Sequence, residues 1–274
     1  MLLTIAVLAI QGQNDNSISA YIRKHDRLKI AVLVQNSAGE ILVCEHEDQV
    51  FSAASIIKIP LLMALYDVYG TPSGHLELAD HTLKENDKVG GAGNIQFLDP
   101  GTVISFQDLA LAMIAQSDNT ATNIIIDLMG IGRINDLIAL QGYQQTRLNR
   151  KMMDVEAISK GIQNQISPSE ANRFLLQIYN SARTGDRKAA MILDLLHQCD
   201  DNAVMPAGLP PDIAVAHKSG LLTEFRGDAG IIFLQKPLFI SIFVEGCSSE
   251  KQAESIIADL TRIIYTSFSK SSKR

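Results

Sequence analysis

Predicted strands lie near both ends of this 274-residue chain, and predicted helices occupy the region between them. Five segments have strand-like apolar patterns: 28–35, 40–45, 214–219, 229–234 and 238–245. Turn-rich residues 36–39 join the first two as a hairpin, and an amphipathic helix is predicted over 249–267. Because this order brings strands from both termini into one sheet, we expect an antiparallel sheet flanked by terminal helices, with an inserted all-helical lobe.

The same order sets the expected domain boundaries. We expect a single domain over 17–268, in which 17–60 and 205–268 form the sheet lobe and 61–204 forms the helical lobe. Residues 269–274 are predicted to be a solvated basic tail.

A long segment between the predicted helices has little regular pattern. It covers 142–167 and is predicted to be irregular, with some helical content. Long irregular segments of compact domains often carry function, so this one is a candidate part of the site.

Composition limits the classes of function. Hydrophobic residues make up 46% of the chain, which is enough for a substantial core. The net charge of −6, the aromatic content of 5% and the absence of tryptophan argue against a surface that binds nucleic acid. The three cysteines include no Cys-x-x-Cys pair, and the histidine group around His75 and His81 lacks the spacing of ligands on one helical face. We therefore expect no metal and no nucleic-acid partner.

The N-terminus contains an apolar run of nine residues, Leu2 to Ile10. This run is too short to span a bilayer, so no membrane span is expected. It resembles the hydrophobic part of an export signal, although no Lys or Arg precedes it and no Ala-x-Ala site follows. We interpret residues 1–16 as a degenerate signal or an N-terminal extension; a misplaced start codon, a trimmed signal and a buried strand are the alternatives.

Three short motifs follow one another along the chain: Ser55-Ile56-Ile57-Lys58, Ser117-Asp118-Asn119 and Lys218-Ser219-Gly220. Together they supply a serine nucleophile, a lysine to activate it, a second hydroxyl to carry a proton and a cationic strand to hold an anion. Ser-x-x-Lys alone has little specificity, because it recurs at 248–251 and 267–270. The other two triplets occur once each, so the ordered set is what points to nucleophilic catalysis.

The first motif is predicted to begin a helix over 55–69. Pro60 limits where this helix can start, because proline is tolerated where its missing N–H has no helical partner, so Ser55 must lie within about one turn of the N-terminus. Ser55 and Lys58 then share one helical face, near the partial positive charge of the helix N-terminus. That charge lowers the pKa of a nearby ammonium, so Lys58 can act as base toward Ser55. A capping serine followed by a surface lysine is the alternative, which the apolar neighbours disfavour.

The other two motifs also have structural alternatives. Ser117, Asp118 and Asn119 are all good helix-capping residues, whereas the functional interpretation uses a hydroxyl that shuttles a proton and an amide that orients a substrate. Lys218 is a solvated lysine on an edge strand in the simplest interpretation. Gly220 instead favours a close approach of another group to that strand.

The motifs, their order and their separations resemble those of the class A β-lactamases, which belong with the penicillin-binding proteins to the penicillin-recognising serine enzymes. The resemblance runs from about residue 28 to residue 265. The supporting stretches are Phe51–Ser55, Ile59–Pro60, Thr120–Asn123, Thr146–Arg150 and Gly230–Ile232. The family's fold is an α/β (α+β) sandwich with a five-stranded antiparallel sheet and a helical lobe, which agrees with the order of elements predicted above.

The resemblance implies roles for the reacting residues. Ser55 would be acylated by the β-lactam carbonyl, with Lys58 in the network that activates it. Ser117 would pass a proton to the departing ring nitrogen. The backbone N–H groups of Ser55 and Leu221 would form the oxyanion hole.

The resemblance also implies a substrate-binding set. Asn119 would hydrogen-bond the amide side chain of the substrate. Lys218 and Ser219 would hold the substrate carboxylate, and Gly220 belongs to the same strand segment. The implied partner is a small-molecule β-lactam or acyl substrate, and no metal or organic cofactor is implied.

The chain departs from the family pattern in the loop that frees the acyl-enzyme. Two residues after the arginine that matches Arg150, the family carries a glutamate that activates water, but this chain has Met152. Glu156 takes the place of an asparagine that also holds this water. We therefore hypothesise that Glu156 is the general base, with Asp154 as second choice and a solvated loop carboxylate as the alternative.

A second departure is at Ala229, where many family members have an arginine that reinforces carboxylate binding. Arg226 is the candidate substitute because it lies three residues earlier. An odd offset along a strand, however, points a side chain to the other face.

These observations favour a serine acyl hydrolase of the β-lactamase type, with deacylation that is slow without the usual glutamate. A penicillin-binding-like enzyme, or an esterase or amidase acting on peptidoglycan or small acyl substrates, is the second hypothesis. A sensor that binds β-lactams or cell-wall fragments without turnover is the third. We expect a monomer and, by resemblance, export to the periplasm or cell envelope, with a cytoplasmic location as the alternative.

Overall fold

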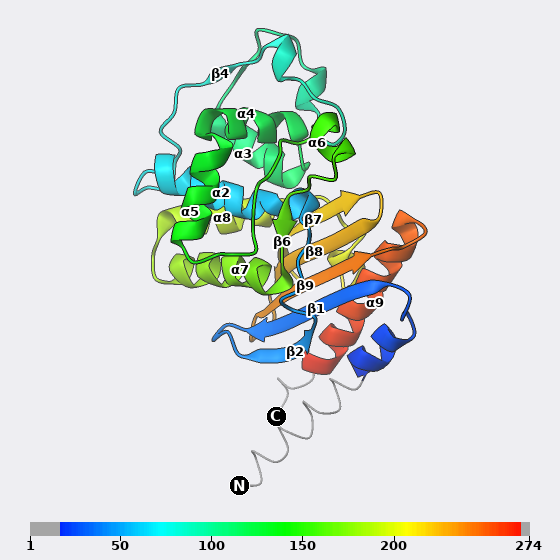
Figure 1. Cartoon of the computed structure of the whole chain (residues 1–274). Coiled ribbons are helices and arrows are strands. Elements are labelled where there is room, and N and C mark those ends of the chain that lie inside the picture. The colour runs from blue at the N-terminus through cyan, green and yellow to red at the C-terminus, as the bar shows by residue number, and fades with distance from the viewer. Residues whose placement is uncertain (1–16, 270–274) are drawn as a thin grey trace.

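The structure is a computed structural model, and it describes residues 17–269. Its centre is a five-stranded antiparallel sheet with the order β2-β1-β9-β8-β7. The strands are β1 (Lys29–Asn36), β2 (Ile41–Glu45), β7 (Val215–Leu222), β8 (Phe225–Ile232) and β9 (Leu238–Glu245). The first strand pairs with the last, which confirms that both ends of the chain contribute to one sheet (Figure 1).

Strand β8 begins earlier than its predicted start at position 229. Arg226 and Asp228 interrupt the apolar pattern, although both are buried within the strand. Each is held by a charged partner, Arg226 by Asp201 and Asp228 by His217. Charge pairing across the fold is invisible in a hydropathy pattern, which is why the prediction placed this segment outside the strand.

The two faces of the sheet belong to two hydrophobic clusters, because successive side chains of a strand point to opposite faces. On β9, Ile242 belongs to the cluster that contains Leu260 of helix α9 (Glu250–Ser269). The next residue, Phe243, belongs to the other cluster, under the helical lobe. Residues 17–23 form a helix beside α9 (Figure 1). Helices therefore cover both faces, as predicted for the sandwich.

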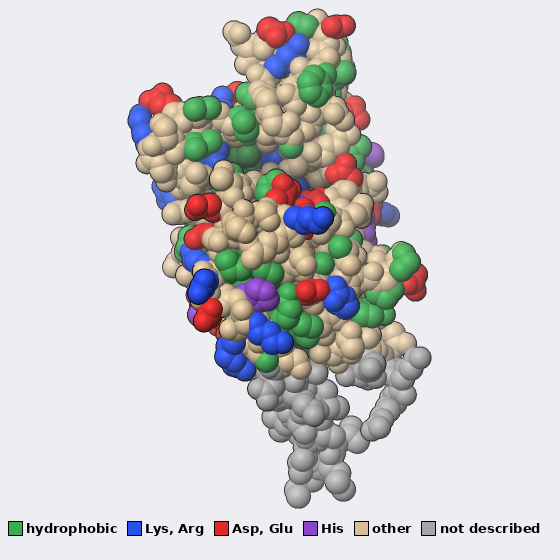
Figure 2. Space-filling model, turned by 90° about the vertical axis from the view of Figure 1, so that its right-hand side faces the viewer, with side chains coloured by type: hydrophobic (Ala, Val, Ile, Leu, Met, Phe, Trp, Pro, Cys, Tyr) green, Lys and Arg blue, Asp and Glu red, His purple; other side chains and the backbone are tan. Residues whose placement is uncertain are grey.

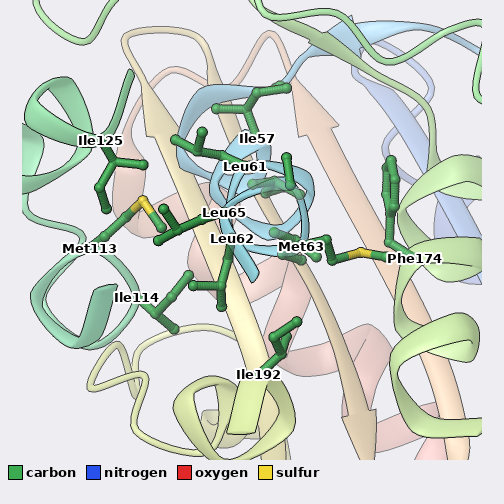
Figure 3. Close-up of a cluster of buried hydrophobic side chains, with 14 of the residues drawn as sticks. Ile57, Leu61, Leu62, Met63, Leu65, Met113, Ile114, Ile125, Phe174 and Ile192 are labelled. Atoms are coloured by element: carbon green, nitrogen blue, oxygen red, sulfur yellow. The ribbon is translucent and has the colours of Figure 1, made fainter. Parts of the chain in front are cut away.

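The helical lobe surrounds one apolar helix, α2 (Lys58–Tyr69). The other long helices of this lobe are α3 (Phe106–Ala115), α4 (Asn119–Met129), α5 (Ile131–Leu140), α7 (Pro168–Arg183) and α8 (Arg187–Leu196). Every residue of α2 from Lys58 to Tyr66 is buried, as expected of a helix that is apolar on all sides. Figure 3 shows side chains from α2 among those of α3, α4, α7 and α8: Leu61, Leu62, Leu65, Met113, Ile114, Ile125, Phe174 and Ile192.

Shorter elements connect these helices. They are β3 (Phe51–Ser52), β4 (His81–Thr82), β5 (Val103–Ile104), β6 (Gln165–Ile166), α6 (Val155–Ser159), and the 3-10 helices η1 (Ala54–Ile57), η2 (Glu85–Asp87), η3 (Ile95–Phe97) and η4 (Met205–Gly208). The segment predicted to be irregular, 142–167, contains α6 and β6. Strand β6 pairs with β3, which ties this segment to the chain just before η1.

Between residues 17 and 269, no helix combines the length and apolar character needed to cross a bilayer. Those same residues contain no group of three or more His, Cys, Asp or Glu side chains suited to a metal ion. The apolar run Leu2–Ile10 and the tail from residue 270 lie outside the described residues. On the face shown in Figure 2, acidic and basic side chains are interspersed.

The sheet approaches the helical lobe closely at Gly220 in β7. A β-carbon at this position would lie 2.9 Å from the β-carbon of Ala54 and 3.1 Å from Cγ1 of Ile56, both in η1. The close approach expected at this glycine is therefore observed. Because η1 also carries Ser55, the packing of strand on 3-10 helix positions the predicted nucleophile.

Gly220→Ala is expected to destabilise the protein by about 1–3 kcal/mol, because the added methyl group must displace η1. Gly132→Ala is the matched control: it lies in the exposed part of α5, has no atom within 4 Å of the added carbon, and should not destabilise. Urea unfolding of both variants and the wild type measures the difference. Equal stability of Gly220→Ala and the wild type would contradict this account of the packing.

Candidate active site

Ser55 lies in η1, directly before α2 begins at Lys58. The preceding residue, Ala54, has a φ of 46°, a left-handed conformation that is unusual for a residue with a side chain. This turn places Ser55 at the N-terminal end of a buried helix, where unpaired backbone N–H groups and the positive end of the helix dipole are found. Pro60 falls within the first turn of α2, as the sequence predicts.

Lys58 is fully buried at the centre of the site. Its Nζ donates hydrogen bonds to the backbone oxygen of Ser117 at 2.7 Å, to Oγ of Ser117 at 3.1 Å and to Oδ1 of Asn119 at 3.2 Å. Burial and the charge of Lys218 hold the pKa of Lys58 well below its usual value, and Asp118 opposes them only in part. A lysine with a lowered pKa is more often neutral and can accept a proton. The surface-lysine alternative is therefore wrong.

The second motif connects α3 to α4 and meets Lys58. Asp118 is the N-cap of α4 and accepts a hydrogen bond from the backbone N–H of Ala121 at 2.8 Å. Ser117 has a φ of 53°, and both its carbonyl and its hydroxyl accept from Lys58. The capping interpretation therefore holds for Asp118, whereas Ser117 and Asn119 are turned to the lysine.

The third motif lies on β7, where Lys218 is 1% exposed and Ser219 is 4% exposed. The burial of Lys218 contradicts the interpretation of a solvated lysine at a sheet edge. Its Nζ donates to the backbone oxygen of Ser219 at 3.1 Å. The Ser219 hydroxyl donates to Asp201, whose carboxylate also accepts from Arg226 at 2.8 Å. The cation and the hydroxyl predicted to hold an anion are thus neighbours, but the hydroxyl already has an acidic partner.

A cavity of about 550 Å³ brings the three motifs together. Its lining includes these predicted site residues: Ser55, Ser117, Asn119, Lys218, Ser219 and Leu221. Lys58 is buried and reaches the lining through its hydrogen bonds to Ser117 and Asn119, while Gly220 faces η1. The volume suits a small molecule.

The structure does not bring Glu156 to this cavity. Glu156 lies in α6, its side chain is 80% exposed, and its carboxylate pairs with Lys160. Asp154, the second choice, is the N-cap of the same helix and accepts from the backbone N–H of Ala157 at 2.9 Å. Neither carboxylate lines the cavity. Asp154 caps α6, and the side chain of Glu156 is turned to solvent. The alternative of a solvated loop carboxylate therefore describes Glu156 in this structure.

Met152 does line the cavity, at the position where the family pattern has its glutamate. Asn123 holds the backbone of Met152 on both sides. The N–H of Met152 donates to Oδ1 of Asn123 at 2.8 Å, and its carbonyl accepts from Nδ2 at 3.0 Å. A thioether is only a weak hydrogen-bond acceptor, so this residue supplies no general base.

The sequence did not point to the acidic residues around Arg226. The guanidinium of Arg226 donates to Asp201 at 2.8 Å and to Glu254 of α9 at 3.0 Å. Its charge is therefore already paired and does not replace the arginine missing at Ala229. No local signal marks Asp201 or Glu254, because the three partners come from three separate segments of the chain.

Several solved structures share this fold. A β-lactamase from Sphaerobacter thermophilus superposes with a TM-score of 0.82 at 26% identity, covering 91% of this chain and 95% of that one. PBP-A gives a TM-score of 0.79 at 26% identity, with 96% of each chain covered. A class A β-lactamase from Bacteroides cellulosilyticus gives 0.83 at 20% identity, with 94% of this chain and 99% of that one covered. This protein therefore has the class A β-lactamase fold. Its sheet combines strands from both ends of the described chain, and a buried lysine lies under an inserted helical lobe.

A family model described as the β-lactamase enzyme family matches residues 13–268. The chain belongs to this family. No curated protein matches the chain. Family and fold together support a hydrolase that acts on small molecules.

A buried charge pair joins β7 to β8 next to Lys218. Nδ1 of His217 lies 3.0 Å from both carboxylate oxygens of Asp228, which also accepts from the backbone N–H of Met205 at 3.1 Å. Burial lowers the pKa of His217, but the charge and hydrogen bond of Asp228, with a hydrogen bond to Cys199, raise it overall to about 10. The pair thus braces the strand that presents Lys218.

The contribution of the His217–Asp228 pair to the free energy of unfolding is expected to fall as the pH rises from 6.5 to about 10. Because folding raises the pKa of His217, its contribution is fully present below the ordinary value of 6.5 and is lost as the pH passes the folded value. In Asp228→Asn this part of the pH dependence should be flatter, since the anion that raises the pKa is gone. Urea unfolding free energies across this range test the idea, and parallel curves for the two proteins would exclude the pair as the cause.

Proposed function

We propose that the protein is a serine acyl hydrolase of the β-lactamase type, which opens a β-lactam ring through an acyl-enzyme on Ser55. The observation that carries the proposal is the buried amine of Lys58, which binds Ser117 and Asn119 at the cavity that Ser55 lines. Burying a lysine is costly, and a strongly lowered pKa beside a cavity is typical of a catalytic base. Membership of the β-lactamase enzyme family supports the same class of reaction.

In the proposed acylation, the neutral amine of Lys58 takes the proton of the Ser55 hydroxyl, and the serine oxygen bonds to the ring carbonyl carbon. The backbone N–H groups of Ser55 and Leu221 stabilise the negative charge on the carbonyl oxygen. The ring C–N bond then breaks, and the hydroxyl of Ser117 gives its proton to the departing nitrogen. Lys58 returns its extra proton to Ser117 across their 3.1 Å hydrogen bond, so that both residues regain their starting states.

Release of the acyl group needs water and a base. Met152 occupies the cavity wall where the family pattern has a glutamate, and Glu156 faces solvent. The acyl-enzyme is therefore proposed to break down slowly.

A penicillin-binding-like enzyme that acts on peptidoglycan or small acyl substrates is the second candidate. The observation that favours it is the same wall at Met152, which lacks a base. PBP-A, at 26% identity, is a relative of this kind by name, and a mutant of PBP-A has been solved as an acyl-enzyme complex with penicillin G. Both candidates share acylation of Ser55 and differ in how fast the adduct is lost.

Ser55→Ala is expected to form no covalent adduct with a penicillin or a cephalosporin and to lose any hydrolysis by about a thousandfold or more, since the nucleophile is gone. Intact-protein mass over time, with antibiotic loss followed in parallel, measures both. Ser248→Ala is the matched control, because Ser248 begins a second Ser-x-x-Lys sequence at an exposed position and should behave as wild type. Adduct formation by Ser55→Ala would remove Ser55 from the mechanism.

Met152→Glu is expected to shorten the lifetime of the acyl-enzyme about a hundredfold, because it places a carboxylate on the cavity wall to activate water. Met152→Gln, of similar size but without a base, is the control and should show no such gain. Glu156→Gln should leave the lifetime unchanged, since that side chain is turned to solvent. Decay of the adduct mass gives the lifetimes; a longer lifetime in Glu156→Gln would return Glu156 to the mechanism.

A further inference from the structure

The hydroxyl of Ser219, one of the two groups predicted to hold a substrate carboxylate, already binds a carboxylate of the protein. Its Oγ donates to Oδ2 of Asp201, and Arg226 donates to the same oxygen at 2.8 Å. Oδ1 of Asp201 accepts from the backbone N–H of Ala203 at 3.3 Å. Asp201 also lines the cavity together with Ser55. An acidic side chain therefore lies where an anionic substrate group would be expected.

Asp201 is held in this place by its surroundings. The loop that carries it is anchored by the backbone N–H of Asp200, which donates to the carbonyl of Ala115 at the end of α3 at 3.1 Å. Arg226 is itself fixed by a second pair with Glu254 at 3.0 Å. Burial opposes ionisation of Asp201, but the hydrogen bond from Ser219 and the charge of Arg226 lower its pKa overall. The carboxylate is thus charged at neutral pH.

A substrate carboxylate beside Ser219 would lack what it needs from the site. A hydroxyl has one hydrogen to donate, and Ser219 donates it to Asp201. Two carboxylates that share a site repel each other unless each has its own cation. Asp201 and Glu254 already share Arg226, so a substrate carboxylate would be a third anion beside two cations, Arg226 and Lys218.

We propose that Asp201 is a specificity-determining residue, which selects against substrates that carry a carboxylate at the Ser219 side of the cavity. The inference rests on the proposed acylation of Ser55 and names the substrate class of that site. The favoured substrates are acyl esters or amides whose group beside Ser219 is neutral or cationic. β-Lactams that carry a carboxylate there are then acylating agents of low rate, although the acylating residues are in place.

Benzylpenicillin and its methyl ester test this proposal, because they differ only in the carboxylate. The measurement is the second-order rate constant for covalent labelling of Ser55, followed by intact-protein mass. The wild-type protein should react with the methyl ester at least as fast as with the free acid. Asp201→Asn should raise the rate with the free acid about tenfold, the order of one hydrogen bond to a charged group, and the rate with the ester less than about threefold.

Asp200→Asn is the matched control, because it removes the same charge from an adjacent, exposed residue of the same cavity wall, whereas Ser219 and Arg226 bond to Asp201. It should change both rates by the same factor. A gain in selectivity as large as that of Asp201→Asn would reduce the effect to the overall charge of the cavity wall and overturn the proposal. A wild-type preference of about tenfold or more for the free acid would also overturn it, whether or not the variants fold. If neither compound labels Ser55 in any of these proteins, the proposed function fails and the inference with it, whereas labelling without the expected selectivity overturns only the role of Asp201.

Discussion

Burial of the Lys58 amine is the constraint on which the rest of the site depends. An amine removed from water needs hydrogen-bond acceptors close by, and the connection between α3 and α4 supplies them through Ser117 and Asn119. A positive-φ turn at Ser117 brings this connection to the amine, and another at Ala54 precedes Ser55, which lines the same cavity as Ser117. Asp118 then holds one of these turns by capping α4. The part of α2 from Ile59 to Tyr66 is apolar and buried, and it fixes this lysine in the core of the helical lobe.

Much of the fold follows from patterns that are local in the sequence. The strands of the sheet, the amphipathic α9 and the mostly apolar α2 can each be recognised from their own residues. Their order then predicts a sheet with an inserted helical lobe. The three motifs were placed at one site by their order and by their resemblance to a family pattern, and all three contribute residues to one cavity. What escaped prediction is the burial of charge in β8, where Arg226 and Asp228 depend on partners from distant segments.

The loop over 142–167 shows a different limit. Spacing relative to a family pattern assigned a position to Glu156, but it could not give the direction of its side chain. Asp154 starts a short helix by capping it, and this turns Glu156 outward to Lys160. Asp201 shows the converse: nothing near it in the sequence marks it as part of a site, yet it bonds Ser219 in the cavity wall. The direction of a side chain and its bonding partners are set by the tertiary structure, whereas the type and order of the elements can be predicted from the sequence.

The pairing of β1 with β9 affects when the candidate site can form during synthesis and folding of the chain. These strands come from opposite ends of the described chain, and β9 is also the strand that joins β1 to β8 and β7. During synthesis, the segment with Ser55 emerges long before the strand with Lys218, and contacts between such distant segments form slowly. The helical lobe can gather around α2 while the sheet is still open. A growing chain therefore lacks the complete candidate site for most of its synthesis, and this site is among the last features to assemble.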